Sequence, residues 1–243
     1  MIAPPWFRGV WRREWIRYGD GAPFEDRVVR DVQTPSVFGS VRIPIDRPTA
    51  RGFDDLDDTQ LRAMLAQKGF AGVATFDGDV ATWHHAIDFQ PRGELDTARI
   101  TQESPSCVLE EGLDDSFAEL WWNLAPNDGR YLGVEVLRDE RVVELYAVVG
   151  DHFVYARDRD RELPDAESLA ELGAGASREE LIALLDCELS YGRVRGARVP
   201  WQIELSTLPW REGAVLDTTS LRSGNVLVNT FTRADHDVIV AAR

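Results

Sequence analysis

The sequence predicts a mainly β protein made of two related antiparallel β-barrels, residues 1–114 and 115–243, each with one or two short helices. The first observation is a segment that occurs twice: residues 83–91 and 201–209 both begin with Trp, alternate apolar and polar residues, and end with Pro. Strict alternation is typical of a β-strand with one buried face. The second observation is a helical pattern before each copy, at 61–65 and 181–185. The third is that short alternating segments are separated by turn residues along the whole chain, as in barrels and sandwiches. We therefore expect an internal duplication of a small domain.

In the first half, alternating segments predict strands at 9–18, 28–34 and 36–44. A Pro-rich piece then leaves the sheet, because Pro cannot donate to a β-ladder. Asp57 followed by Gln60 predicts a capping box at the start of a helix whose apolar stripe includes Leu61 and Leu65. A hairpin is expected next, followed by two short strands. These segments are 70–76 and 80–89 for the hairpin, then 99–103 and 107–111.

In the second half, the segment 157–162 alternates Arg with acidic residues. We expect it to be a solvated loop, because alternating charges have no apolar partner to bury. Ser177 and Glu180 predict a second capping box at the start of a helix over 178–185, after a short helix at 167–172. The expected strands are 117–123, 132–136, 142–155, 189–194, 200–205, 215–218, 226–232 and 238–241.

The composition is acidic, since 27 Lys and Arg face 42 Asp and Glu and leave a net charge of −15. This balance argues against a nucleic acid or an anionic membrane as partner, because binding phosphates relies on Lys and Arg. No segment approaches the roughly 20 apolar residues that cross a bilayer, and the amino terminus has no secretory pattern. Cys107 and Cys187 lack the spacing of a metal or redox site. We therefore expect a cytoplasmic protein with no metal, no cofactor and no membrane insertion.

His84 and His85 are the most suggestive candidates for chemistry, together with Asp88. Adjacent side chains on a strand point to opposite faces, so the two His residues cannot enter one site. His85 has the same parity as Trp83, Ile87 and Phe89, which predicts that His85 points inward and His84 outward. An inward His is either a hydrogen-bonded core residue or a polar contact for a ligand. Neither a Gly-rich phosphate loop nor a nucleophile elbow is present in the sequence.

Arg42 has the same strand parity as Phe38 and Ser40. Inside a barrel it would anchor an anionic group with its fixed donors, or it would pair with a carboxylate such as Glu14 or Glu119. The Trp residues near the start of the chain either fill the core or line a pocket. The predicted ligand-binding residues of the first barrel are Trp11, Trp15, Arg42, Trp83 and His85.

Gly9-Val-Trp11 resembles the Gly-x-Trp signature of the lipocalin and calycin families. Further pieces resemble a narrower group, the lipocalin-like proteins of two tandem barrels that are known in fungi as partners of a casein kinase and have bacterial relatives of unassigned function. These pieces are 33–44, 83–91, 108–112 with 117–121, and 189–192. The resemblance implies two lipocalin-like antiparallel β-barrels in an intracellular protein, and it implies no catalytic residue. The kinase partnership is not carried over, because no docking motif can be matched.

Three functional hypotheses follow from these observations. The first is binding of a small hydrophobic or amphipathic molecule in a barrel cavity. The second is a cofactor-independent isomerase, cyclase or hydrolase for a hydrophobic substrate, with His85 as general acid or base and Arg42 stabilising negative charge. The third is a scaffold with filled barrels whose acidic surface binds another protein.

Overall fold

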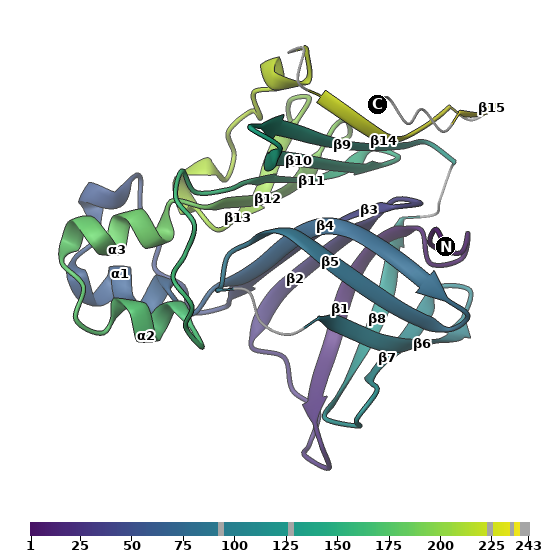
Figure 1. The fold of residues 1–243 in the computed structure, drawn as a ribbon, viewed down its shortest axis with the longest axis horizontal. Coiled ribbons are helices and arrows are strands. Elements are labelled where there is room, and N and C mark those ends of the chain that lie inside the picture. The colour runs from purple at the N-terminus through teal and green to yellow at the C-terminus, as the bar shows by residue number, and fades with distance from the viewer. Residues whose placement is uncertain (92–94, 126–128, 223–225, 234–235, 239–243) are drawn as a thin grey trace.

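The first half of the chain forms a closed antiparallel barrel of eight strands in sequential order (Figure 1). The computed structural model describes residues 1–91, 95–125, 129–222, 226–233 and 236–238. The barrel strands are β1 (Gly9–Tyr18), β2 (Arg27–Gln33), β3 (Val37–Pro44), β4 (Lys68–Asp77), β5 (Val80–Asp88), β6 (Asp96–Ser104), β7 (Cys107–Gly112) and β8 (Phe117–Ala125). β8 closes the barrel by pairing with both β7 and β1, and it lies beyond residue 114, where the sequence places the division between domains. The barrel therefore needs the strand that was expected to begin the second domain.

The second half forms an open sheet of seven strands in the order β13-β12-β11-β10-β9-β14-β15. Its strands are β9 (Tyr131–Arg138), β10 (Arg141–Val149), β11 (His152–Arg157), β12 (Glu188–Arg193), β13 (Gln202–Ser206), β14 (Val226–Arg233) and β15 (His236–Val238). β13 and β15 are its two edges, and no pairing among the described residues joins them. A mainly β fold is confirmed, whereas the prediction of a closed barrel is met in the first half alone. The strand expected at 238–241 falls mostly outside the described residues.

The helices form where the capping residues predict them. Asp57 with Gln60 and Ser177 with Glu180 both make complete capping boxes. The helical elements are η1 (Phe53–Asp55), α1 (Asp58–Met64), α2 (Leu169–Gly173), α3 (Arg178–Leu185), η2 (Pro209–Arg211) and η3 (Thr219–Arg222). The three α-helices gather in one lobe beside the barrel and the sheet, where α3 contacts both α1 and α2 (Figure 1).

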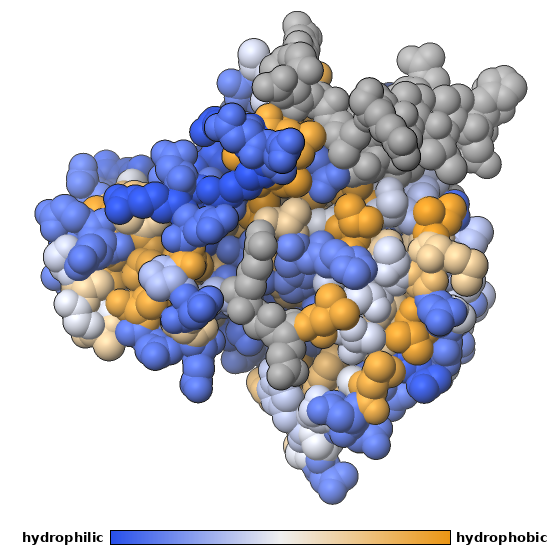
Figure 2. Space-filling view, viewed as in Figure 1, coloured by the Kyte–Doolittle hydropathy of each residue, from blue (hydrophilic) through white to orange (hydrophobic). Residues whose placement is uncertain are grey.

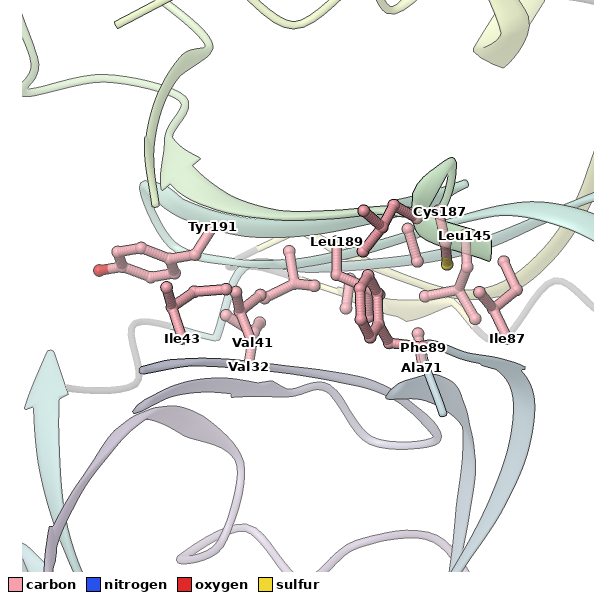
Figure 3. Close-up of a cluster of buried hydrophobic side chains, with 14 of the residues drawn as sticks. Val32, Val41, Ile43, Ala71, Ile87, Phe89, Leu145, Cys187, Leu189 and Tyr191 are labelled. Carbon is pink, nitrogen blue, oxygen red and sulfur yellow. The ribbon is translucent and has the colours of Figure 1, made fainter. Parts of the chain in front are cut away.

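The largest hydrophobic core lies between the barrel and the second sheet (Figure 3). Val41, Ile43 and Phe89 reach it from the barrel, and Leu189 and Tyr191 reach it from the sheet. The two surfaces approach so closely that a Cβ added to the β3 glycine at position 39 would lie 2.4 Å from a methyl group of Val154. Because the barrel and the sheet bury their apolar side chains in this one shared cluster, they form one packed body.

A second cluster fills the inside of the barrel, and a third covers the other face of the sheet. The outer surface seen in Figure 2 is mostly hydrophilic, with scattered hydrophobic patches over the barrel. Within the described ranges, no helix is both long and apolar enough to cross a membrane.

Candidate functional site

A β-bulge in β5 decides which side chains enter the open end of the barrel. His85 is opposite Gly72 and Ile87 is opposite Ala71, so one extra residue, Ala86, interrupts the register. A bulge reverses the faces of all residues that follow it. Ile87 consequently joins the core against the second sheet, together with Phe89. The prediction that these two side chains lie on the same face as His85 is therefore wrong.

The two adjacent His residues lie on opposite faces of the sheet, as their spacing predicts. His84 is exposed, and its Nε2 lies 3.0 Å from the hydroxyl of Thr75 on the neighbouring strand. The ring of His85 stacks on the ring of Phe70, with the centroids 4.1 Å apart and the planes at 10°. Phe38, a member of the barrel's internal cluster, lies 5.9 Å from the same imidazole ring.

His85 is held between two carboxylates. Its Nδ1 lies 2.7 Å from Oδ2 of Asp88, and its Nε2 lies 3.3 Å from Oδ2 of Asp96. Burial of the imidazole disfavours its charged form, but the hydrogen bonds to Asp88 and then Asp96 outweigh burial and raise the pKa of His85 above its ordinary value. The bulge thus brings together an imidazole and two carboxyl groups at the open end of the barrel.

The Asp88→Asn variant is expected to lower the pKa of His85, because the strongest favourable partner loses its charge. The raised pKa means that the charged form stabilises the fold below the pKa of an unfolded His, and that this contribution is lost as pH rises through the folded pKa. Titration of the His85 ring protons by NMR measures the pKa in both proteins, and the exposed His84 provides the internal reference. Equal His85 pKa values in the two proteins would contradict the assignment.

Arg42 contacts the same Phe70 ring on which His85 stacks. Its guanidinium carbon is 4.7 Å from the centroid of the Phe70 ring, and its Nη1 is 3.5 Å from Oε1 of Glu119. Nε donates to the hydroxyl of Ser40 at 3.0 Å. Burial lowers the pKa of Arg42, but Glu119 and Asp31 more than compensate and raise it, so the side chain stays charged. Arg42 and His85 therefore contact one ring, and the alternative partner for Arg42, Glu119, is also present.

A hollow of about 770 Å³ opens beside this aromatic contact. Its walls include Lys68, Phe70, His85 and Asp96, with Phe117 from β8. A second hollow of about 490 Å³ shares His85 and Asp88 and extends to β10 and the segment after β11. We call the residues that line the first hollow the mouth of the barrel; among them His85 contacts both Asp88 and Asp96.

Arg159 connects the second sheet to this mouth. Nη1 donates to the carbonyl oxygen of Asp88 at 3.0 Å, Nη2 to that of Phe89 at 2.7 Å, and Nε to that of Leu184 at 2.6 Å. The side chain is buried and its guanidinium lies over the Phe89 ring at 5.2 Å. The prediction that the whole 157–162 loop is solvated is thus wrong for Arg159, because backbone carbonyls supply the partners. No feature of the sequence marks such carbonyls in advance.

The remaining predicted residues do not reach the mouth. Trp11 and Trp83 are buried inside the barrel, where both pack near Phe7. Trp15 follows a register shift in β1 and pairs with Leu120 of β8. Leu120 and its neighbour Glu119 point to opposite faces, and Glu119 is the buried one of the two. The structure consequently places Trp15 on the outside of the barrel, Trp11 and Trp83 in its interior, and His85 at its mouth, whereas Arg42 lies against Phe70 and does not line the mouth itself.

No family model matches the chain, and no curated protein matches it by sequence. Among solved structures, the fold is similar to the crystal structure of the uncharacterized protein YLR301w from Saccharomyces cerevisiae. The match covers 86% of this chain and 89% of that chain, with a TM-score of 0.54 and 13% identity. At this identity the likeness shows a common fold alone and assigns neither ligand nor reaction.

Proposed function

We propose that this protein binds a small amphipathic molecule at the mouth of the barrel. The observation that carries the proposal is the shared contact of Arg42 and His85 with the Phe70 ring, beside a hollow of about 770 Å³. An apolar part of the ligand would contact the edge of the Phe70 ring, because His85 and Arg42 lie against its faces. Its polar part would meet the imidazole of His85 and the carboxylates of Asp88 and Asp96.

The size of the available space favours the mouth over the interior of the barrel. Ligand pockets commonly measure about 300–1,000 Å³ and combine apolar walls with a few convergent polar groups. The cavity inside the barrel measures only about 20 Å³. The expected lipocalin-like binding in the centre of a barrel is thus replaced in our proposal by binding at its open end.

The Phe70→Leu variant is expected to bind the ligand about tenfold more weakly, because it keeps apolar volume but loses the ring that holds His85 and Arg42 in place. Native mass spectrometry of gently purified protein identifies what co-purifies. Titration calorimetry with aromatic amines, aromatic acids and fatty acids then gives affinities. Phe24→Leu is the matched control, because Phe24 is 44% exposed and outside the mouth. Unchanged affinity in Phe70→Leu, or no binding to any member of the panel, would refute the proposal.

A cofactor-independent isomerase, cyclase or hydrolase is the second candidate, and it depends on the 2.7 Å contact between His85 and Asp88 at the same mouth. A protonated imidazole held by a carboxylate can donate a proton to a bound substrate. Arg42 would stabilise negative charge that develops nearby. NMR spectra of the recovered compound before and after incubation with fresh protein separate the two candidates, because an enzyme changes its structure, even where its mass stays the same, and a binding protein returns it intact.

The lipocalin-like duplication remains part of the proposal. In support, each half runs from a capped helix into two paired strands: α1 precedes β4 and β5, and α3 precedes β12 and β13. The two helices also pack against each other. A duplicated barrel whose second copy opened to cover the first would explain both the internal repeat and the single closed barrel.

A further inference from the structure

A small cavity lies inside the barrel, separate from the mouth. It measures about 20 Å³, which exceeds the roughly 10–15 Å³ that one water molecule needs. The rings of Trp11, Trp83 and Trp121 line it, together with Phe7 and Phe38. Two carboxyl groups, from Asp31 and Glu110, also line it, together with Val32 and Gln33. Aromatic rings around a carboxylate are the usual surroundings of a bound ammonium group.

Two buried Arg side chains near this cavity, Arg13 and Arg42, bind groups other than Glu110. Arg13 donates to Glu25 through Nε at 2.8 Å and to Glu119 through Nη1 at 2.5 Å. Arg42 donates to Ser40 and lies 3.5 Å from Glu119. Asp31 accepts a hydrogen bond from the Ser40 hydroxyl at 2.5 Å and feels the charge of Arg42. The guanidinium groups are thus shared mainly among carboxylates other than Glu110.

Glu110 is the carboxyl group without such a partner. It is 7% exposed, and its carboxyl makes no hydrogen bond with any described residue. It lies directly opposite Glu119 in the pairing of β7 with β8, so a second acid adjoins it on the same face. The Glu110 carboxyl lines the cavity, so a group inside the cavity can supply the partner that nearly all buried polar groups in proteins have.

We propose that Glu110 is the counter-ion of a small ammonium group, ammonium itself or methylammonium, held in the aromatic cavity of the barrel. The cation would donate to Glu110 and to Asp31 and would lie among the aromatic rings. This site is distinct from the amphipathic ligand site at the mouth, because different residues line it.

The electrostatics of the cavity agree with a missing cation. Burial, and next the charge of Glu119, raise the pKa of Glu110 well above its ordinary value, and Asp96 and Asp31 add to the effect against the attraction of Arg42. Burial likewise raises the pKa of Asp31 to about 6. At a pH below its own raised pKa, Glu110 is protonated when the cavity holds no cation. Binding of an ammonium group would ionise it and release one proton.

The test is a titration of the full-length protein with methylammonium chloride, followed by tryptophan fluorescence and by calorimetry in two buffers of different ionisation enthalpy. Sodium chloride at equal ionic strength and methanol are the controls for salt and for a neutral group of similar size. We expect a saturable fluorescence change, proton release, and affinity at least about tenfold weaker in Glu110→Gln. Glu111→Gln is the matched control, because Glu111 is the next residue on β7 and takes no part in the cavity.

Three outcomes would overturn the proposal. One is an equal response to methanol, which would mean that the cavity takes a hydroxyl or water that accepts from the unpartnered Nε1 of Trp121. The second is unchanged affinity in Glu110→Gln. The third is binding without proton release in the wild-type protein, a measurement that does not depend on whether a variant folds. The Phe70→Leu variant should keep the methylammonium response, so a failure of the mouth proposal is distinguishable from a failure of this one.

Discussion

Replacing Phe89 by Ala is expected to lower the free energy of unfolding by about 3–5 kcal/mol, the usual cost of removing a fully buried aromatic ring. Phe89 is 0% exposed and lies in the core between the barrel and the second sheet (Figure 3). The same ring lies under the guanidinium of Arg159, which donates to the carbonyl oxygen of Phe89. Its loss leaves a cavity where the two halves of the molecule meet.

Chemical denaturation followed by circular dichroism measures this change. Phe24→Ala is the control, and we expect a loss of about 1 kcal/mol or less, because Phe24 is 44% exposed. A small loss in Phe89→Ala, similar to that of the control, would mean that the barrel and the sheet do not form one core.

Replacing Arg13 by Met is expected to cost about 3–5 kcal/mol, because it removes the nearest partner of the buried Glu119 and leaves only the more distant Arg42, at 3.5 Å. Arg13 and Glu119 each have side chains that are 3% exposed and lie 2.5 Å apart. Burial lowers the pKa of Arg13, but the hydrogen bond to Glu25 and the charge of Glu119 raise it overall, so the guanidinium keeps its charge. Met preserves much of the apolar stem, so the measured loss reports the charge and its hydrogen bonds.

The neighbouring residue supplies a matched control for this prediction. Arg12 pairs with Glu14 at 2.7 Å, but the two side chains are 42% and 41% exposed. Exposed pairs contribute about 0–1 kcal/mol, so Arg12→Met should have little effect on unfolding. Equal losses in the two variants would contradict the view that burial, and not mere pairing, makes Arg13 important.

Several local elements of the fold follow from the sequence alone, for reasons that lie within a few residues. The strand expected at 215–218 does not form, because Val215 makes only an isolated bridge to Gln202, and the strand expected at 142–155 is divided into β10 and β11. Strand β1 alternates, and the hairpin of β4 and β5 turns at an Asp-Gly-Asp sequence. The two capping boxes form because Asp57 and Ser177 satisfy backbone donors of their own helices. The opposite faces of His84 and His85 follow from the period of two along a strand.

The candidate site depends on features that strand alternation does not contain. One extra residue, Ala86, sends Ile87 to the outer core and leaves Asp88 beside His85. A register shift near Glu14 places Trp15 outside the barrel. Bulges arise from pairing with a neighbouring strand, so a single strand's pattern cannot locate them.

The sequence by itself thus determined that this chain is a mainly β protein with two capped helices and with Arg42 and His85 as polar residues of its first barrel. Tertiary structure alone decided that β8 completes that barrel, that the second half stays open among the described residues, and that Arg159 binds the carbonyl oxygens of Asp88 and Phe89. The physical reason is range: alternation and capping act between neighbours in the chain, whereas closure, bulges and buried ion pairs join residues that meet only when the sheets pack.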